Sequence, residues 1–185
     1  MVLAAFVLAG ILALASSQPA GAELRVSDLD VYLNDHEVTV HVVLLGVIPP
    51  EYLESLHSGI PAHLRVAVEL WRYSRLLSDR RVDRTIVERT LTYNVVTKEY
   101  KVTMGTSERR PPTTTRDLRD AERVLSEAHG VKLTPATSLD PSAIYYVRIR
   151  AETAVNGDSS WMARMSGLAE QTSRRSDYRT IAPTR

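Results

Sequence analysis

From Leu24 onward, apolar and polar residues alternate with a period of two, which is typical of strands that bury one face. The alternation slips by one residue near Asp28, and this predicts a β-bulge in the first strand. A polar turn over residues 34–37 separates that strand from a second one over residues 38–45. The pattern therefore predicts an antiparallel hairpin at the start of the folded part.

The most regular alternation lies in residues 60–73. One face carries Leu64, Val66, Val68 and Leu70, and the other carries Arg65, Ala67, Glu69 and Trp71. A slip of one residue would expose the whole aliphatic set, so we expect Val68 in the core and Glu69 at a position that tolerates substitution. Similar patterns predict strands over residues 82–93, 99–104 and 143–155.

Three segments have helical spacing instead. The first covers residues 50–58, with Pro50 in its first turn and Gly59 at its end. The second covers residues 116–129, with Thr115 as the N-cap and Gly130 as the stop signal. The third, over residues 161–170, is less regular, and residues 131–140 are rich in turn-forming residues.

Consecutive strands joined by short turns predict a mainly β fold, namely an antiparallel β-sandwich, immunoglobulin-like, with two or three short helices. A chain of 185 residues is long enough for one such domain. We expect the sandwich to cover residues 23–173. Residues 174–185 contain four arginines and one aspartate, and we expect them to form a basic C-terminal tail.

Residues 1–22 have the layout of a secretory signal peptide: an apolar run to Ala15, a polar stretch, and Ala20-Gly21-Ala22 before Glu23. The uncharged run from Val2 to Ala15 reaches only about 21 Å as a helix, against about 30 Å for a hydrocarbon core. We expect cleavage before Glu23 and a periplasmic or other extracytoplasmic location. The alternative is an N-terminal anchor in the inner membrane formed by residues 1–15, since no Lys or Arg precedes the run.

The composition excludes several classes of function. The chain has no cysteine, which removes disulfides, thiol nucleophiles and cysteine metal sites. Its net charge of +1 provides no global attraction to nucleic acid. The five histidines lack the helical spacing of a zinc site, and solvated or packed histidines are favoured over a surface metal site at His36 and His41. With no nucleophile elbow or phosphate-binding loop either, we predict no enzymatic activity and no cofactor.

Two segments combine aromatic or aliphatic residues with arginine, a composition typical of binding hot spots. One is the cluster around Trp71, which includes Arg75, Arg80 and Arg81, and the other is the basic tail. The candidate partner-binding residues are Trp71, Arg72, Tyr73, Arg175, Tyr178, Arg179 and Ile181. The alternatives are a Trp71 that packs on the core beneath stacked arginines, and a tail without fixed structure. If the tail does bind, it would dock on an acidic envelope partner or add a strand to a sheet edge.

Several segments resemble one family of exported bacterial proteins. They are Gly59-Ile60-Pro61, the strand over 66–72, Asp79, the stretch over 91–102, the helix over 118–125 and the strand over 144–151. The family is catalogued as a domain of unknown function, family 4390, and the resemblance covers residues 24–155. The chain differs in having Leu76-Leu77-Ser78 where a tryptophan-rich stretch is expected, and in lacking a proline- and tryptophan-rich ending.

The resemblance implies no activity, but family members are often encoded beside a transmembrane sensor kinase. It therefore suggests, by association, a periplasmic accessory or sensing role. We expect a non-enzymatic envelope module that binds another envelope or membrane protein, with a sensor-kinase ectodomain as one candidate partner. The alternative is a carrier or sensor of a small ligand held in a pocket of the sandwich.

Overall fold

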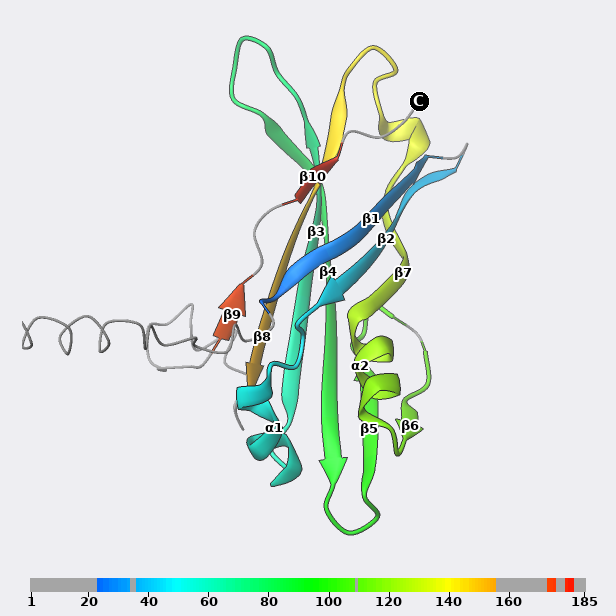
Figure 1. The fold of residues 1–185 in the computed structure, drawn as a ribbon. Helices are drawn as coiled ribbons and strands as arrows, with labels where there is room; N and C mark the ends of the chain where they lie inside the picture. Colours follow the sequence, from blue (N-terminus) through cyan, green and yellow to red (C-terminus); the bar gives the residue numbers. More distant parts are fainter. Residues whose placement is uncertain (1–22, 34–35, 109, 156–172, 176–178, 182–185) are drawn as a thin grey trace, which may run out of the picture.

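The predicted strands form two antiparallel sheets in the computed structural model, which describes residues 23–33, 36–108, 110–155, 173–175 and 179–181 (Figure 1). The small sheet has the order β1 (Arg25–Leu33), β2 (Glu37–Leu45), β7 (Glu127–Pro135). The large sheet has the order β10 (Arg179–Ile181), β8 (Tyr145–Val155), β3 (Ala62–Arg72), β4 (Arg80–Asn94), β5 (Glu99–Met104), β6 (Thr113–Thr115). The strand β9 (Ser173–Arg175) also pairs with β8.

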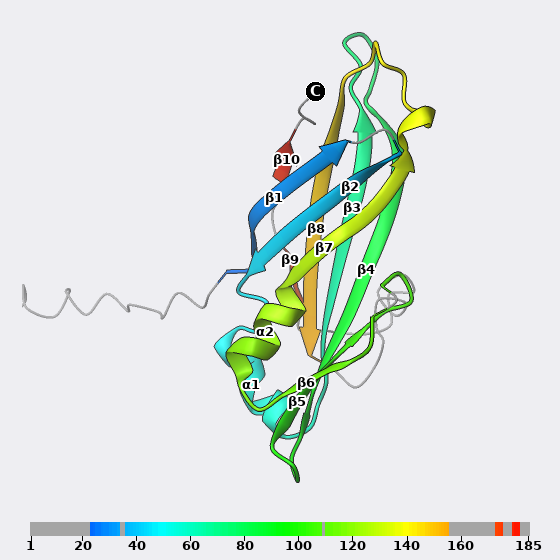
Figure 2. The ribbon, with the colours of Figure 1, turned by 90° about the vertical axis from the view of Figure 1, so that its right-hand side faces the viewer.

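Two helices, α1 (Pro50–His57) and α2 (Leu118–Ser126), lie at one end of the two sheets, and a short 3-10 turn, η1 (Ala136–Ser138), follows β7 (Figures 1 and 2). The mainly β, two-sheet antiparallel sandwich is therefore confirmed. The immunoglobulin-like arrangement stays a prediction, because three strands here face a much larger sheet, whereas immunoglobulin domains divide their strands more evenly. No helix among the described residues is long and apolar enough to cross a membrane.

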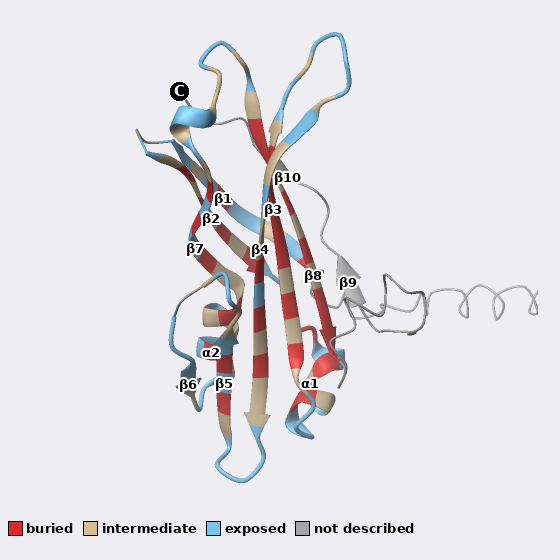
Figure 3. Ribbon diagram, turned by 180° about the vertical axis from the view of Figure 1, so that it is seen from behind, coloured by how far each residue is buried: buried red, intermediate tan, exposed pale blue. Residues whose placement is uncertain are grey.

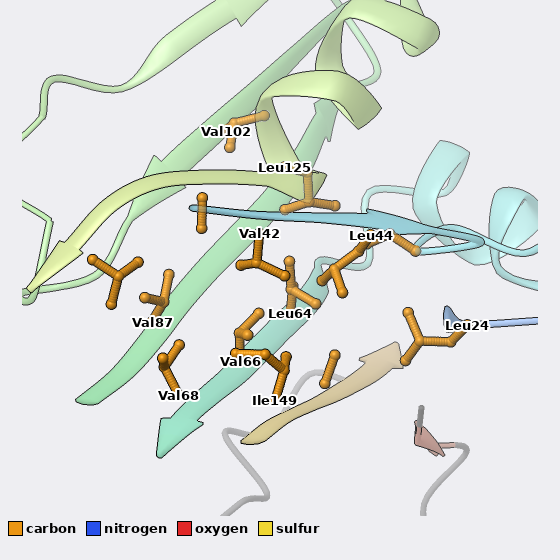
Figure 4. Packing of buried hydrophobic residues seen from close by; sticks show 14 of the residues in the cluster. Leu24, Val42, Leu44, Leu64, Val66, Val68, Val87, Val102, Leu125 and Ile149 are labelled. Carbon is orange, nitrogen blue, oxygen red and sulfur yellow. The ribbon is translucent and has the colours of Figure 1, made fainter. Parts of the chain in front are cut away.

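The core lies between the two sheets and is closed at the helical end by α1 and α2. In Figure 4, Val42 and Leu44 of β2 point toward Leu64 and Val66 of β3, and Leu125 of α2 lies beside them. All these side chains are fully or almost fully buried, as are the other aliphatic residues of the same faces. Burial of a single aliphatic side chain contributes roughly 1.5–3 kcal/mol, so this cluster supplies the main stabilising term.

The strand β3 confirms the predicted face and corrects the prediction for the opposite one. Leu64, Val66, Val68 and Leu70 are all buried, and burial is continuous over residues 66–70 in the middle of the strand (Figure 3). Glu69, however, is only 8% exposed. Its carboxylate accepts a hydrogen bond from Trp71 Nε1 at 3.0 Å and lies 3.3 Å from Arg81. The expected tolerance at Glu69 is therefore wrong, because a lysine there would place a third cation beside Arg81 and Arg84.

The first hairpin and the first helix are confirmed. β1 and β2 pair with a register shift between Val26 and Asp28, where the sequence predicted a bulge. α1 begins at Pro50, buries Tyr52 and Leu56 one turn apart, and is followed by Gly59 with φ +91°. The N–H of Gly59 donates to the carbonyl of Leu56 at 2.9 Å, so the glycine ends the helix as its sequence position indicated.

The second helix is shorter than predicted at both ends. Asp117, not Thr115, is the N-cap, and its carboxylate accepts the N–H of Arg119 at 2.7 Å. At the other end the helix stops at Ser126, and the chain enters β7 directly. Gly130 therefore does not end the helix; it lies within β7 at φ +71°, where one extra residue forms a bulge opposite β2.

Arg89, a buried residue of β4, binds the backbone at the end of α2. Its Nη1 donates to the carbonyls of Val124 at 2.6 Å, Leu125 at 3.0 Å and Glu127 at 2.8 Å. These groups lie at the helix end, where carbonyls lack partners inside the helix. The same guanidinium binds Glu108 through Nε and Nη2, at 2.7 and 2.6 Å. The charged side chain of Arg89, from a strand distant in the sequence, thus binds the helix end in place of the glycine that the sequence predicted there.

Part of the segment predicted to be a tail belongs to the large sheet. Arg179–Ile181 pair with Ile149, Arg148 and Val147, and Ser173–Arg175 pair with Ala154, Thr153 and Glu152. The sheet thus extends beyond residue 173, where the sequence placed the end of the sandwich. The predicted signal peptide over residues 1–22 and the predicted helix over 161–170 lie outside the described residues.

The buried face of β3 can be tested with a single charge. Val68→Asp places an unpaired carboxylate among aliphatic side chains and should lower the unfolding free energy by about 3–5 kcal/mol, measured by urea denaturation. The matched control is Val96→Asp, at a position 89% exposed in the β4–β5 turn, which should change it by less than about 0.5 kcal/mol. Equal effects of the two substitutions would show that the faces of β3 are assigned wrongly.

Candidate interaction surface

The predicted cluster around Trp71 lies at the end of the large sheet that is opposite the two helices. Two loops project there, over residues 73–79 between β3 and β4 and over 139–144 before β8 (Figure 1, top). They are joined by a hydrogen bond from the N–H of Tyr73 to the carbonyl of Ile144, 2.9 Å long. Trp71 and Tyr146 are direct neighbours across β3 and β8. The pair of strands β3 and β8 therefore supports both loops.

Trp71 is half-buried on the outer face of the large sheet and anchors a polar network. The guanidinium of Arg148 lies 4.5 Å from the centre of the Trp71 ring and 5.1 Å from that of Tyr146. Such cation–π contacts contribute roughly 0.5–2 kcal/mol. Trp71 thus lies beneath a stacked arginine, as the alternative expected, but on the outer face of the sheet and not on the core. Trp71 supports the surface from below and is not its exposed anchor.

Asp79 holds the β3–β4 loop in a fixed shape. Its Oδ1 accepts the N–H of Ser74 at 2.9 Å, and its Oδ2 accepts the hydroxyl of Tyr146 at 2.5 Å. Inside the loop, the N–H of Leu77 donates to Ser74 Oγ at 3.1 Å. The Tyr146 hydrogen bond, followed by that of Ser74, lowers the pKa of Asp79 below its ordinary value of 3.8. Burial and the Asp79 hydrogen bond together raise the pKa of Tyr146.

The fixed loop presents apolar side chains to solvent. Leu76 is 93% exposed and Leu77 is 80% exposed, and the adjoining Tyr73 and Ile144 are about half exposed. We name these four residues, together with Arg72, Arg75, Arg80 and Arg81, the loop-end surface. Contiguous exposed apolar side chains are uncommon on monomeric proteins, which makes the loop-end surface a candidate for interaction.

The loop-end surface is basic around its apolar tip. Arg75 and Arg80 are exposed. Arg72 pairs with Asp140 at 2.9 Å, and hydrogen bonds from Ser142 and the nearby Arg72 lower the pKa of that carboxyl. The prediction from sequence found the arginines, Trp71 and Tyr73 here, but missed Leu76, Leu77, Ile144 and Asp79. A pair of leucines inside a turn was the available signal, because turns are normally polar.

The described tail residues belong to β9 and β10, which both pair with β8 and so lie two strands away from β3. Ile181 is paired with Val147 of β8, and Val147 is paired in turn with Leu70 of β3. Arg179 is paired with Ile149, and Arg175 with Glu152. Tyr178 lies outside the described residues. β8 therefore separates the two candidate segments, and Glu152, the partner of Arg175, is paired with Arg65, toward the other end of β3 from Trp71.

Two of the described histidines, His41 and His57, lie in aromatic contacts away from this surface. No group of three or more His, Asp or Glu side chains is placed to hold a metal ion within that part of the chain. His41 lies between Tyr32 and His129, at ring-centre distances of 4.9 and 5.3 Å. His57 Nε2 and the Tyr100 hydroxyl are hydrogen-bonded at 2.7 Å, and burial raises the pKa of Tyr100.

A comparison with known protein families found a match. Residues 21–181 match the domain of unknown function DUF4390. The chain belongs to that family. The resemblance seen in the sequence is thus confirmed, and the match extends through β9 and β10 to the last described residue. No curated protein and no solved structure matches.

The fixed shape of the loop in this DUF4390 chain can be tested at Tyr146. Tyr146→Phe removes the hydroxyl that stabilises the Asp79 carboxylate, so the pKa of Asp79 should rise toward 3.8. The amide hydrogen of Ser74 should also exchange faster. Both quantities can be measured by NMR.

The matched control for Tyr146→Phe is Tyr145→Phe, because the Tyr145 hydroxyl accepts the N–H of Asp140 and not a bond from the β3–β4 loop. Folding lowers the pKa of Asp79, so the carboxylate stabilises the loop fully above pH 3.8, and this contribution is lost as the pH falls through the lowered value. The account would be contradicted if Tyr146→Phe left both quantities unchanged, or if Tyr145→Phe altered them equally.

Proposed function

We propose that this chain is a non-enzymatic accessory protein of the bacterial envelope, which binds another envelope or membrane protein through the loop-end surface. The observation that carries the proposal is the pair Leu76 and Leu77, almost fully exposed on a loop that Asp79 holds in place. Exposed apolar side chains lower solubility, and a structure that fixes them in solvent is best explained by a partner that covers them.

The composition of the loop-end surface supports a protein as the partner. Tyrosine and arginine are enriched at binding hot spots, and here they surround an aliphatic tip. The loop is already ordered by its internal hydrogen bonds, so that binding costs less conformational entropy than ordering a free segment would. The complementary surface is an apolar pocket with an acidic rim, since arginine forks bind carboxylates in two-point contacts.

The proposed location of the protein and the proposed class of its partner are inferred from the sequence. The signal-peptide pattern over residues 1–22 supports export, and an uncleaved segment would keep the protein at the inner membrane. The ectodomain of a membrane sensor kinase is one candidate partner, because resemblance to the family suggests that setting. In this proposal the protein has no catalytic residue and needs no cofactor, and its role is to hold or modulate a membrane complex.

A carrier of a small ligand is the alternative, and the interior favours it less. The described aliphatic side chains between the two sheets form one continuous buried cluster. Hollows of about 350 and 470 Å³ lie on the surface of the described part of the chain, one beside α2 and one at the β4–β5 turn. An enclosed apolar cavity with a few polar groups would be the usual site for a carried ligand.

The proposal can be tested by crosslinking in living cells. A photoreactive residue at position 77 should capture one envelope protein, whereas the same residue at position 96, which is at least as exposed and lies at the opposite end of the sheet, should not. The double change Leu76→Ser and Leu77→Ser should then reduce co-purification of that protein at least tenfold without changing the thermal midpoint. Equal capture from positions 77 and 96, or co-purification that survives the double change, would contradict the proposal.

A further inference from the structure

Two histidines lie side by side on the outer face of the small sheet, whose three strands are seen next to one another in Figure 2. His41 of β2 alternates with the buried Val40 and Val42, so it lies on the solvent-facing side of the strand. The ring centre of His129, from β7, is 5.3 Å from that of His41, and the ring planes are at 83°. On the other side of His41, the ring centre of Tyr32 from β1 is 4.9 Å away. All three strands of the small sheet therefore contribute a ring to this face.

A bulge in β7 places His129 beside His41. Between two neighbouring rungs of the β2–β7 pair, β2 has the single residue His41, whereas β7 has two residues, His129 and Gly130. Gly130 has φ +71°, which glycine adopts without strain, and a Cβ there would meet no atom within 4 Å. The backbone of the bulge, and not a lack of space, therefore requires the glycine. Bulges redirect side chains and are frequent next to functional sites.

Both rings have a nitrogen that can bind a ligand. Within the described part of the chain, neither ring nitrogen of His41 has a hydrogen-bond partner, and its contacts are with the two neighbouring rings. A neutral imidazole has one acceptor nitrogen, which is a common metal ligand. The Nε2 of His129 is 3.3 Å from the Glu127 carboxylate, which leaves its Nδ1 available. A carboxylate on one nitrogen commonly orients a histidine whose other nitrogen binds a metal ion.

The separation of the two rings fits one metal ion between them. A ring nitrogen lies about 2.0–2.1 Å from a bound zinc ion, which puts the ring centre about 3.2 Å from the metal. Two rings at the tetrahedral angle then have centres about 5.2 Å apart, close to the observed 5.3 Å. The His129 side chain is 46% exposed, and rotation about χ2 of a histidine is only weakly restricted. Its ring can therefore turn Nδ1 toward a point shared with a nitrogen of His41.

We propose that His41 and His129 bind a divalent transition-metal ion on the outer face of the small sheet. Imidazole suits zinc, nickel and copper ions, whereas magnesium and calcium ions prefer oxygen ligands. Since no third His, Asp or Glu side chain of the described residues is placed to bind the same ion, water completes its coordination. The ion therefore binds more weakly than in a closed site with four protein ligands, and it keeps positions open for a group from another molecule.

The metal site concerns a different surface from the proposed function and does not depend on it. The loop-end surface lies at the end of the large sheet, whereas β2 and β7 belong to the small one. Loss of crosslinking at position 77 with intact metal binding would contradict the proposed function alone, and the reverse result would contradict the metal site alone. The pair also differs from the one considered in the sequence, His36 and His41, because residue spacing does not reveal the bulge in β7.

The test is a calorimetric titration of the metal-free protein, purified without a polyhistidine tag, with Cu²⁺, Zn²⁺ and Mg²⁺. One Cu²⁺ should bind per chain, more tightly than Zn²⁺, and Mg²⁺ should not bind. His41→Gln and His129→Gln should each weaken Cu²⁺ binding at least tenfold. The matched control is His63→Gln, on the large sheet, where Nδ1 lies 3.2 Å from the Thr90 hydroxyl, and this variant should bind as the unmodified protein does.

The thermal midpoint of each variant without metal shows whether the protein still folds. The half-exposed His129 can be replaced without opening the core, so His129→Gln should keep the midpoint of the unmodified protein. The inference would be overturned if neither Cu²⁺ nor Zn²⁺ bound saturably. It would also be overturned if Cu²⁺ binding survived both substitutions, which would place the ion elsewhere, or if His63→Gln weakened binding as much as His129→Gln does.

Discussion

The buried ion pair between Arg89 and Glu108 is the interaction on which the arrangement of this sandwich depends. The Arg89 side chain is 1% exposed and that of Glu108 is 9% exposed. Removing a guanidinium and a carboxylate from water costs several kcal/mol each, and such a pair is tolerated only when its remaining groups are also satisfied. Arg89 meets this condition, because Nε and Nη2 bind the carboxylate while Nη1 binds three backbone carbonyls.

The pair joins three parts of the chain that are distant in sequence: β4, the loop after β5, and the junction of α2 with β7. Gly105 allows the loop to approach β4, since its N–H donates to the carbonyl of Glu88 at 2.7 Å and a Cβ there would lie 2.8 Å from that oxygen. Glu108 thereby reaches Arg89. Arg89 in turn fixes where the helix ends, so β7 can pair with β2 while α2 covers the core and leaves the hollow beside β2.

The local patterns of the sequence predicted most strands, because alternation depends only on which residues face the core. The same reasoning found α1, whose Pro50 and Gly59 are local signals. It placed the end of α2 wrongly because the deciding group, Arg89, lies 36 residues before Leu125. It also treated Glu69 as exposed, since the arginines that cover its carboxylate come from the neighbouring strand β4.

The candidate surface was only partly predictable for the same reason. Arginine and aromatic residues identified the end of β3, but composition could not show that Trp71 supports the surface while Leu76 and Leu77 form its tip. Exposure of the leucines depends on Asp79, which is held by Tyr146 from a strand 67 residues later in the chain. The role of Arg179–Ile181 as a sheet strand likewise depends on β8.

The central claim is tested most directly by a double-mutant cycle on Arg89→Met and Glu108→Met, with the unfolding free energy measured by urea denaturation. Each single change leaves a buried charge without its partner and should cost about 3–5 kcal/mol. The double change should cost less than the sum, with a coupling energy of about 1–3 kcal/mol. Additive effects, or single changes that each cost less than about 1 kcal/mol, would contradict the claim that this pair determines the arrangement of α2 and β7.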